Sequence, residues 1–188
     1  MDFNKSIFEN TRGNIIVCAH RGLCGGNIPC NTSASFLAAL EAGADMIELD
    51  IIKSRDGELF IFHPGKEATH LRTRFPLSAM SSKAISKLRY VNYDGVKTHY
   101  GVEKLEDILL LLKDKCYINV DKYWSHIPEI TAMIRKCGVE KQVVWSSTIK
   151  VESTNTLKVD RIKERKERCL RNGKVQRRIQ ERSNPVIG

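Results

Sequence analysis

The chain has 188 residues and a formal net charge of +9, with 41% hydrophobic and 28% charged residues. This length allows one sizeable hydrophobic core and leaves little room for a second full domain. The composition is that of an ordinary globular protein, so neither a disordered nor a fibrous class is favoured.

Apolar runs and helical patterns alternate along the first 147 residues. In chain order they predict a strand over 14–20, a helix over 32–43, strands over 46–52 and 58–63, helices over 81–88 and 105–113, a strand over 116–120, a helix over 128–137 and a strand over 142–145. A tight turn at 55–57 joins the second and third strands, by a hairpin-like reversal or a short crossover. The stretch 64–100 is long and otherwise polar. This succession argues for a parallel α/β architecture.

The alternation stops after Ser147. Residues 151–188 hold eleven basic and five acidic residues, so +6 of the net charge belongs to this end and +3 remains for the first 150 residues. We interpret 1–147 as the folded domain and 148–188 as a basic tail, either a charged helix or a disordered extension. Binding of RNA or of a membrane surface by the tail is the alternative. No nucleic-acid partner is expected for the folded part, because no basic patch is implied there.

The sequence also bears on location and on the cysteines. No apolar segment of signal-peptide length starts the chain, and no run approaches the roughly 18 apolar residues of a membrane span, so we expect a cytoplasmic protein. The six cysteines form no Cys-x-x-Cys pair. In a reducing compartment we expect them to be buried free thiols rather than a disulfide framework.

Three short polar motifs each follow an apolar run: Ala-His-Arg-Gly at 19–22, Glu-Leu-Asp at 48–50 and Phe-His at 62–63. Each would emerge at the C-terminal end of a strand, where α/β barrels keep their chemistry. Glu48 and Asp50 are two positions apart on a strand, so their carboxylates face the same side. Together with Asp121, at the end of the fourth predicted strand, they could hold a divalent cation such as Mg²⁺ or Ca²⁺.

The basic residues of these motifs suit phosphodiester cleavage. Of His20 and His63, one can take a proton from a nucleophile while the other gives a proton to a leaving alkoxide. The guanidinium group of Arg21 could donate two hydrogen bonds to phosphate oxygens, and Lys122 could add a positive charge. Cys30 as a nucleophile is disfavoured, because nothing nearby in the sequence plainly activates a thiolate. The residue types therefore predict metal-assisted phosphodiester cleavage.

The order of four motifs resembles the glycerophosphodiester phosphodiesterase family over residues 14–147. The motifs are Ala-His-Arg-Gly at 19–22, Asn-Ile-Pro-Cys-Asn-Thr at 27–32, Ala-Gly-Ala-Asp-Met-Ile-Glu-Leu-Asp-Ile at 42–51 and Asp-Gly-Glu-Leu-Phe-Ile-Phe-His at 56–63. The resemblance implies a TIM-type (β/α) barrel that hydrolyses a glycerophosphodiester, a small-molecule substrate, to an alcohol and sn-glycerol 3-phosphate with a bound divalent cation.

The resemblance also assigns roles to single residues. It implies that His20 and His63 are the general base and acid, in an order it does not fix, and that Arg21 binds phosphate. Glu48 and Asp50 would bind the metal. The third ligand of the family is usually Glu in an Asn-x-Glu-x-Lys setting. Here Asp121 would take its place, and Lys122 lies one position early.

Two motifs depart from the family pattern. Pro-Cys-Asn-Thr at 29–32 replaces the usual Pro-Glu-Asn-Thr, and His63-Pro64 replaces the usual His-Asp. Loss of the Glu removes a carboxylate near the site, so either the local hydrogen bonding is rebuilt or activity falls.

The predicted barrel is short. A complete (β/α)₈ barrel usually needs about 250 residues, and only five strands can be placed before the tail. We therefore expect an incomplete barrel with open sheet edges, which self-association could cover. Two hypotheses follow: a working phosphodiesterase, or a catalytically impaired family member that binds a partner through its basic tail. A related phosphodiesterase acting on lysophospholipids or sphingolipids is also open.

Overall fold

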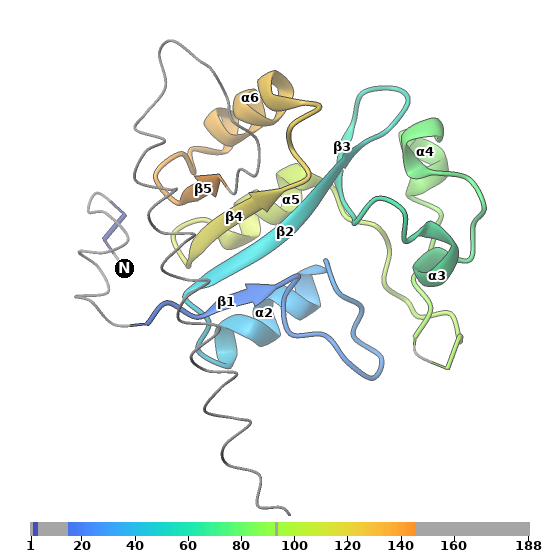
Figure 1. The fold of residues 1–188 in the computed structure, drawn as a ribbon, viewed down its shortest axis with the longest axis horizontal. Coiled ribbons are helices and arrows are strands. Elements are labelled where there is room, and N and C mark those ends of the chain that lie inside the picture. The colour runs from blue at the N-terminus through green and yellow to red at the C-terminus, as the bar shows by residue number, and fades with distance from the viewer. Residues whose placement is uncertain (1, 4–14, 93, 146–188) are drawn as a thin grey trace, which may run out of the picture. The chain divides into compact units, whose positions relative to one another are not determined.

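A computed structural model of the chain describes residues 2–3, 15–92 and 94–145. Their main sheet consists of four parallel strands in the order β1-β2-β4-β5 (Figure 1). The strands are β1 (Cys18–His20), β2 (Met46–Lys53), β4 (Tyr117–Asp121) and β5 (Val143–Trp145). The predicted tail at 148–188 lies outside the described residues, so the domain boundary stays a prediction.

A fifth strand, β3 (Leu59–Ile61), pairs antiparallel with the end of β2. The parallel ladder between β2 and β4 ends at the pair Asp50 and Asp121, and Ile51 to Lys53 run on beyond it. Their backbone groups need partners, and β3 supplies them. Of the two predicted connections the hairpin is therefore correct and the short crossover wrong. The sequence predicts that the strand before His63 is a parallel barrel strand, and this is wrong, because β3 runs antiparallel to β2.

Three longer helices were predicted to within one or two residues: α2 (Ser33–Glu41), α5 (Leu105–Leu112) and α6 (Ile127–Cys137). Thr32 is the N-cap of α2, and it forms a capping box with Ser35. Gly138 ends α6 in the left-handed conformation, at φ +66°, as glycine at that position commonly does.

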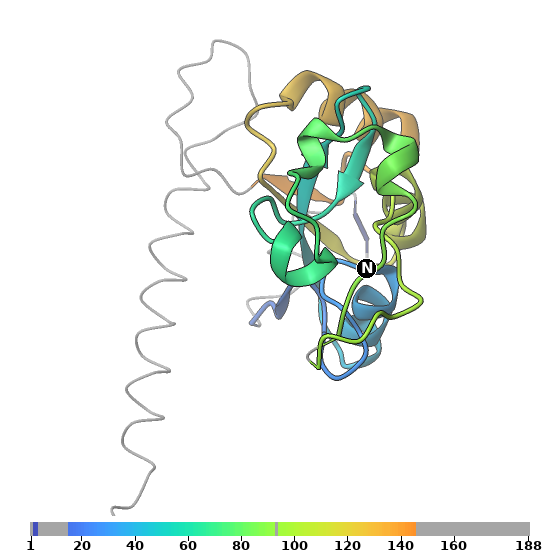
Figure 2. The same cartoon turned by 90° about the vertical axis from the view of Figure 1, so that its right-hand side faces the viewer.

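The three longer helices, α2, α5 and α6, pack against one face of the sheet, as the side view shows (Figure 2). Ile47, Leu49 and Ile51 of β2 belong to this buried core. Because side chains alternate along a strand, Glu48 and Asp50 face the opposite side. The alternation thus separates the core of the domain from the acidic side chains.

The stretch 64–100 is more ordered than its polar composition predicts. It contains α3 (Glu67–Leu71), the 3₁₀ helix η1 (Leu77–Ala79) and α4 (Ser82–Ile85), the last shorter than the predicted helix over 81–88. A second buried cluster links this stretch to the hairpin; its members are Ile52, Phe60, Phe62, Leu71, Leu77, Ile85, Tyr90 and Val102. The apolar residues of the stretch are irregularly spaced, so no helical or strand period reveals them.

The cysteines correct a further expectation. Cys24 and Cys30 form a disulfide, with Cα atoms 5.0 Å apart, where we expected free thiols. A tight turn causes the approach, since Gly25 and Ile28 exchange backbone hydrogen bonds of 3.1 and 3.0 Å. Cys116 and Cys137 are buried and free as expected, whereas Cys18 is exposed because β1 has one neighbouring strand among the described residues. The sixth cysteine, at position 169, lies outside them.

Within the described part of the chain, every helix is too short or too polar to cross a bilayer.

Candidate active site

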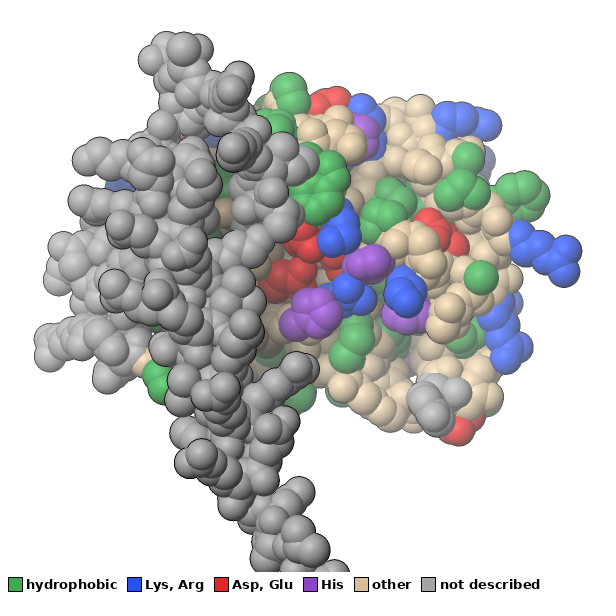
Figure 3. Space-filling model, in the orientation of Figure 1, with side chains coloured by type: hydrophobic (Ala, Val, Ile, Leu, Met, Phe, Trp, Pro, Cys, Tyr) green, Lys and Arg blue, Asp and Glu red, His purple; other side chains and the backbone are tan. Residues whose placement is uncertain are grey.

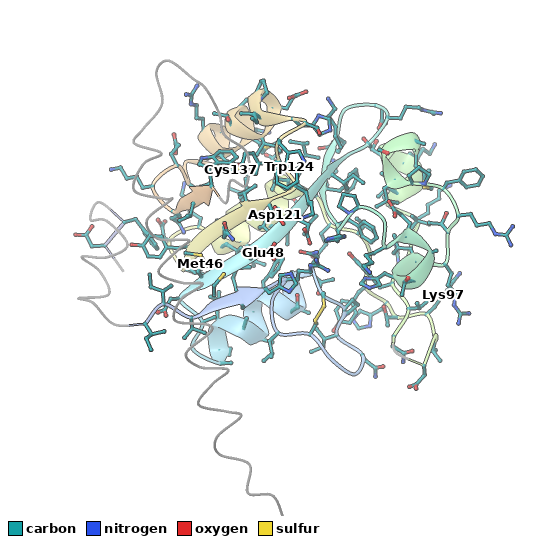
Figure 4. All side chains as sticks on the ribbon, viewed as in Figure 1. Met46, Glu48, Lys97, Asp121, Trp124 and Cys137 are labelled. Atoms are coloured by element: carbon teal, nitrogen blue, oxygen red, sulfur yellow. A yellow bond between two sulfur atoms is a disulfide. The ribbon has the colours of Figure 1, made fainter. Side chains whose placement is uncertain are left out.

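Three carboxylates converge at the carboxyl ends of two neighbouring parallel strands. Glu48 and Asp50 come from β2, and Asp121, opposite Asp50 in the ladder, comes from β4. One oxygen from each lies within 4.8 Å of the others. Figure 4, in which Glu48 and Asp121 are labelled, shows them on adjacent strands. This is the oxygen donor set that a hard divalent cation prefers.

Burial and mutual repulsion perturb the acidic cluster. Glu48 is 6% exposed. Burial, followed by the negative charges of Asp50 and Asp121, raises the pKa of Glu48 to about 7. Burial also acts to raise the pKa of Asp121, but hydrogen bonds from the Lys122 backbone (2.8 Å) and Nζ (2.6 Å) outweigh it, and that pKa is lowered. The cluster therefore concentrates negative charge that its own surroundings only partly compensate.

Asp50 supplies a direct test of whether a cation would fit. Its Oδ2 accepts a hydrogen bond of 2.9 Å from Asn31 Nδ2 and lies 2.9 Å from Arg21 Nε. Its Oδ1 is buried, and no donor among the described residues reaches it. Leaving an anionic oxygen buried without a partner is costly, and a cation at the cluster would satisfy it. The residues present therefore fit a divalent cation.

His20 borders the cluster from β1, the strand that pairs with β2 on the side away from β4. It ends β1, is in register with Glu48, and places Nε2 3.9 Å from Glu48 Oε2. Its side chain is 71% exposed. Burial of part of the ring, and then the charge of Arg21, lower the pKa of His20. A lowered pKa favours the neutral ring near pH 7, which can accept a proton.

His63 follows β3, and the hairpin returns it to the level of Asp50, since Phe62 N donates to Asp50 O at 3.0 Å. His63 Nδ1 lies 2.8 Å from the Pro64 carbonyl. A carbonyl only accepts hydrogen bonds, so Nδ1 carries the proton and Nε2 is left for other partners. The residue after His63 thus orients the ring through its backbone, although it is Pro rather than the Asp usual in the family.

Arg21 and Lys122, the predicted phosphate ligands, both lie at the cluster and are paired with its carboxylates. Arg21 faces Asp50, and its backbone N donates to Glu48 Oε2 at 3.1 Å. Both residues have positive φ, +60° for Arg21 and +57° for Lys122. This conformation is uncommon for residues with a Cβ. It turns the chain sharply just after each strand, so that the side chains stay beside the strand ends.

The structure brings together all seven predicted site residues, and His70, which the sequence did not single out, lies near enough to Arg21 and His63 to feel their charges. This histidine lies on α3, with its ring 6.4 Å from the rings of Phe62 and Tyr90. Burial, followed by the charges of Lys66, Arg21 and His63, lowers the pKa of His70. The polar stretch in which it lies gave no signal except a histidine seven residues after His63.

The space-filling view shows how these groups reach the surface. Acidic side chains form a group on the visible face, bordered by histidines and by basic side chains (Figure 3). The site therefore offers three carboxylates that could hold a cation, with histidines and basic side chains beside them.

Comparisons with known proteins agree with this picture. The sequence model of the Glycerophosphoryl diester phosphodiesterase family matches residues 20–179. The chain is 28% identical over 142 residues to the uncharacterized protein YqiK of Bacillus subtilis, covering 70% of this chain and 57% of that protein. It is 27% identical over 136 residues to the probable glycerophosphodiester phosphodiesterase 2 of Mycobacterium tuberculosis, covering 72% and 49%.

Solved structures give the fold. A glycerophosphodiester phosphodiesterase from Agrobacterium tumefaciens matches with a TM-score of 0.61 and 25% identity, covering 72% of this chain and 58% of that one. A glycerophosphoryl diester phosphodiesterase from Parabacteroides distasonis matches with a TM-score of 0.63 and 19% identity, covering 70% and 46%. The protein is thus a TIM-type (β/α)-barrel protein in which part of the barrel is described, and the predicted fold class is confirmed.

The particular family is equally clear: the chain belongs to the glycerophosphoryl diester phosphodiesterase family. The chain spans about half the length of the Bacillus subtilis and Mycobacterium tuberculosis relatives.

Proposed function

We propose that this protein hydrolyses a glycerophosphodiester to an alcohol and sn-glycerol 3-phosphate with the help of a divalent cation, Mg²⁺ or Ca²⁺. Membership of the family supports the reaction class. The observation that carries the proposal is the carboxylate cluster of Glu48, Asp50 and Asp121 beside His20. These three carboxylates would hold the cation, whose charge would stabilise the negative charge that builds on the phosphate oxygens.

The two histidines would move the protons. His20 is largely exposed and its pKa is lowered, so its neutral ring can accept a proton from the water that attacks the phosphorus as the bond to the alcohol oxygen breaks. His63 presents Nε2 and holds Nδ1–H against the Pro64 carbonyl. In its protonated form it can give the Nε2 proton to the leaving alkoxide. In the reverse assignment His63 would be the base and His20 the acid. The pH dependence of turnover in variants that lack one of the two histidines distinguishes the two assignments.

Arg21 and Lys122 would bind the phosphate. Each has more donors than its carboxylate partner uses, because guanidinium has five N–H groups and ammonium three. Arg21 Nε lies 2.9 Å from Asp50 Oδ2 in an ion pair, and Lys122 Nζ donates to Asp121 Oδ2 at 2.6 Å. The remaining donors are available to phosphate oxygens next to the cluster.

The test measures release of glycerol 3-phosphate from glycerophosphocholine by the full chain, with an enzyme-coupled assay in Mg²⁺, Ca²⁺ or EDTA. We expect release only with a cation, and a loss of about 100- to 10,000-fold in His20→Ala, the range of general acid–base catalysis. His99→Ala removes an exposed histidine elsewhere and should leave turnover unchanged.

Two results would overturn the proposal: no cation-dependent turnover of glycerophosphocholine, or full activity of His20→Ala. Lysophosphatidylcholine and sphingomyelin, tested in parallel, decide whether a related lipid diester is the substrate instead.

A further inference from the structure

Asn31 links the loop after β1 to the acidic cluster. Asn31 Nδ2 donates to Asp50 Oδ2 at 2.9 Å, and Asp50 N donates to Asn31 Oδ1 at 3.4 Å. Asn31 is 3% exposed and Asp50 is fully buried. The amide therefore contacts both the side chain and the backbone of Asp50, away from competing water.

This contact divides the two oxygens of Asp50 between different partners. Oδ2 is occupied by Asn31 and faces Arg21 Nε, whereas Oδ1 has no donor among the described residues. A carboxylate fixed through one oxygen has its other oxygen fixed in direction. Partners that orient a ligand in this way commonly contribute to metal affinity.

The position of the amide depends on an unusual backbone. Asn31 has φ +58°, in the left-handed region that Asn and Gly adopt more readily than other residues. Its N–H donates to Arg21 O at 3.0 Å. The next residue, Thr32, caps α2 and donates through Oγ1 to Pro29 O at 2.7 Å. Asn31 is therefore held from both sides along the chain.

The disulfide closes the loop that leads into Asn31. Cys24 and Cys30 are joined, and Cys30 is the residue immediately before Asn31. Cys24 is exposed and the loop carries Gly25 and Gly26, so without the covalent link this segment would have considerable freedom. The cross-link limits that freedom next to the residue that contacts Asp50.

We propose that Asn31 is a positioning residue that presents Asp50 Oδ1 to the cation, and that the Cys24–Cys30 disulfide holds Asn31 in place. The inference rests on the cation site of the proposed function and extends it to residues that touch neither cation nor substrate. Opening the disulfide should then weaken cation binding through Asn31 alone.

The first test titrates Ca²⁺ and Mg²⁺ into the full chain by calorimetry. Asn31→Gly keeps the left-handed backbone and its N–H but removes the amide, and we expect Kd to rise by about 10- to 100-fold, the usual cost of losing such a partner. Asp114→Gly is the matched control. Asp114 also has positive φ (+60°), is exposed, and lies at the opposite end of β4, so Kd should not change.

Urea unfolding in EDTA checks that both variants fold cooperatively. If Asn31→Gly does not, Asn31→Ser takes its place, with the same expected weakening, because the shorter hydroxyl cannot make both contacts with Asp50.

The second test asks whether the disulfide acts through Asn31. Cys24→Ser/Cys30→Ser should raise Kd in the wild-type background and cause no further rise in Asn31→Gly, as expected of coupled sites. An unchanged Kd in Asn31→Gly overturns the inference and leaves the proposed function standing. An equal rise in both backgrounds overturns the link through Asn31. A wild-type chain that binds neither cation overturns the cation site itself.

Discussion

Replacing Glu48 by Gln should stabilise the cation-free protein at neutral pH while it weakens cation binding. The carboxylate of Glu48 is buried beside two others, and its pKa is raised from 4.5 to about 7. A raised pKa means that the charged form is disfavoured in the folded state. Gln has the same shape without the charge, and its Oε1 can still accept the hydrogen bond that Arg21 N donates.

The pKa shift sets the size of the effect. It amounts to about 2.5 units, and each unit corresponds to 1.36 kcal/mol, so the penalty is about 3 kcal/mol at most. The unfolded chain releases the proton near pH 4.5 and the folded chain near pH 7. Between these values the folded state binds more protons, so wild-type stability falls as pH rises. We therefore expect Glu48→Gln to gain little at pH 4.5 and about 2 to 3 kcal/mol at pH 8.

Urea unfolding followed by the fluorescence of Trp124 and Trp145, in EDTA at several pH values from 4.5 to 8, measures this difference. Glu41→Gln, at the exposed end of α2, is the control and should stay within about 0.5 kcal/mol of wild type. The reasoning is refuted if Glu48→Gln is no more stable than wild type at pH 8. With Ca²⁺ at 1,000 times the wild-type Kd the order should reverse, because a ligand at that concentration stabilises by about 4.1 kcal/mol.

Three further outcomes test other parts of the structure. His63→Ala should lower turnover by about 100- to 10,000-fold with Ca²⁺ affinity unchanged; a large loss of affinity in calorimetry would argue against a proton-transfer role. Hydrogen bonds from Ser54 and Ser82 hold the pKa of Asp56 at about 2, so Asp56→Asn should lower the urea midpoint above pH 4, and the deficit should shrink as pH falls towards 2. A deficit independent of pH would contradict that role. Leu109→Ala, in the buried core, should cost about 2 to 5 kcal/mol in urea unfolding, and a loss below 1 kcal/mol would place this side chain outside a packed core.

Local rules were enough for much of the site. The two-residue spacing of Glu48 and Asp50 put both carboxylates on one face, and the apolar residues that alternate with them pack on the other. The alternation of strands and helices indicated that the ends of β1, β2 and β4 would lie together. The ends of the three longer helices differ from the prediction by one or two residues, because capping contacts and not the hydrophobic period decide where a helix ends.

Local rules failed where contacts are irregular or distant in sequence. The stretch 64–100 packs Leu71, Leu77, Ile85 and Tyr90 against the hairpin without any regular spacing, so its sequence predicts a polar segment instead of a buried cluster. The disulfide was missed because the lack of a Cys-x-x-Cys pair and the expected reducing compartment argued for free thiols, whereas the turn between Gly25 and Ile28 brings the two sulfur atoms together.

The sequence by itself determined the family, the class of fold and which charged residues gather at the strand ends, because each motif is short and its polar residues directly follow an apolar strand. Only the tertiary structure decided how those residues divide their contacts. The hairpin returns His63 to the level of Asp50, and Pro64 orients the His63 ring. Asn31 donates to one oxygen of Asp50, and the other has no donor among the described residues. These contacts depend on the direction of side chains across strands and loops, which spacing along the chain does not specify.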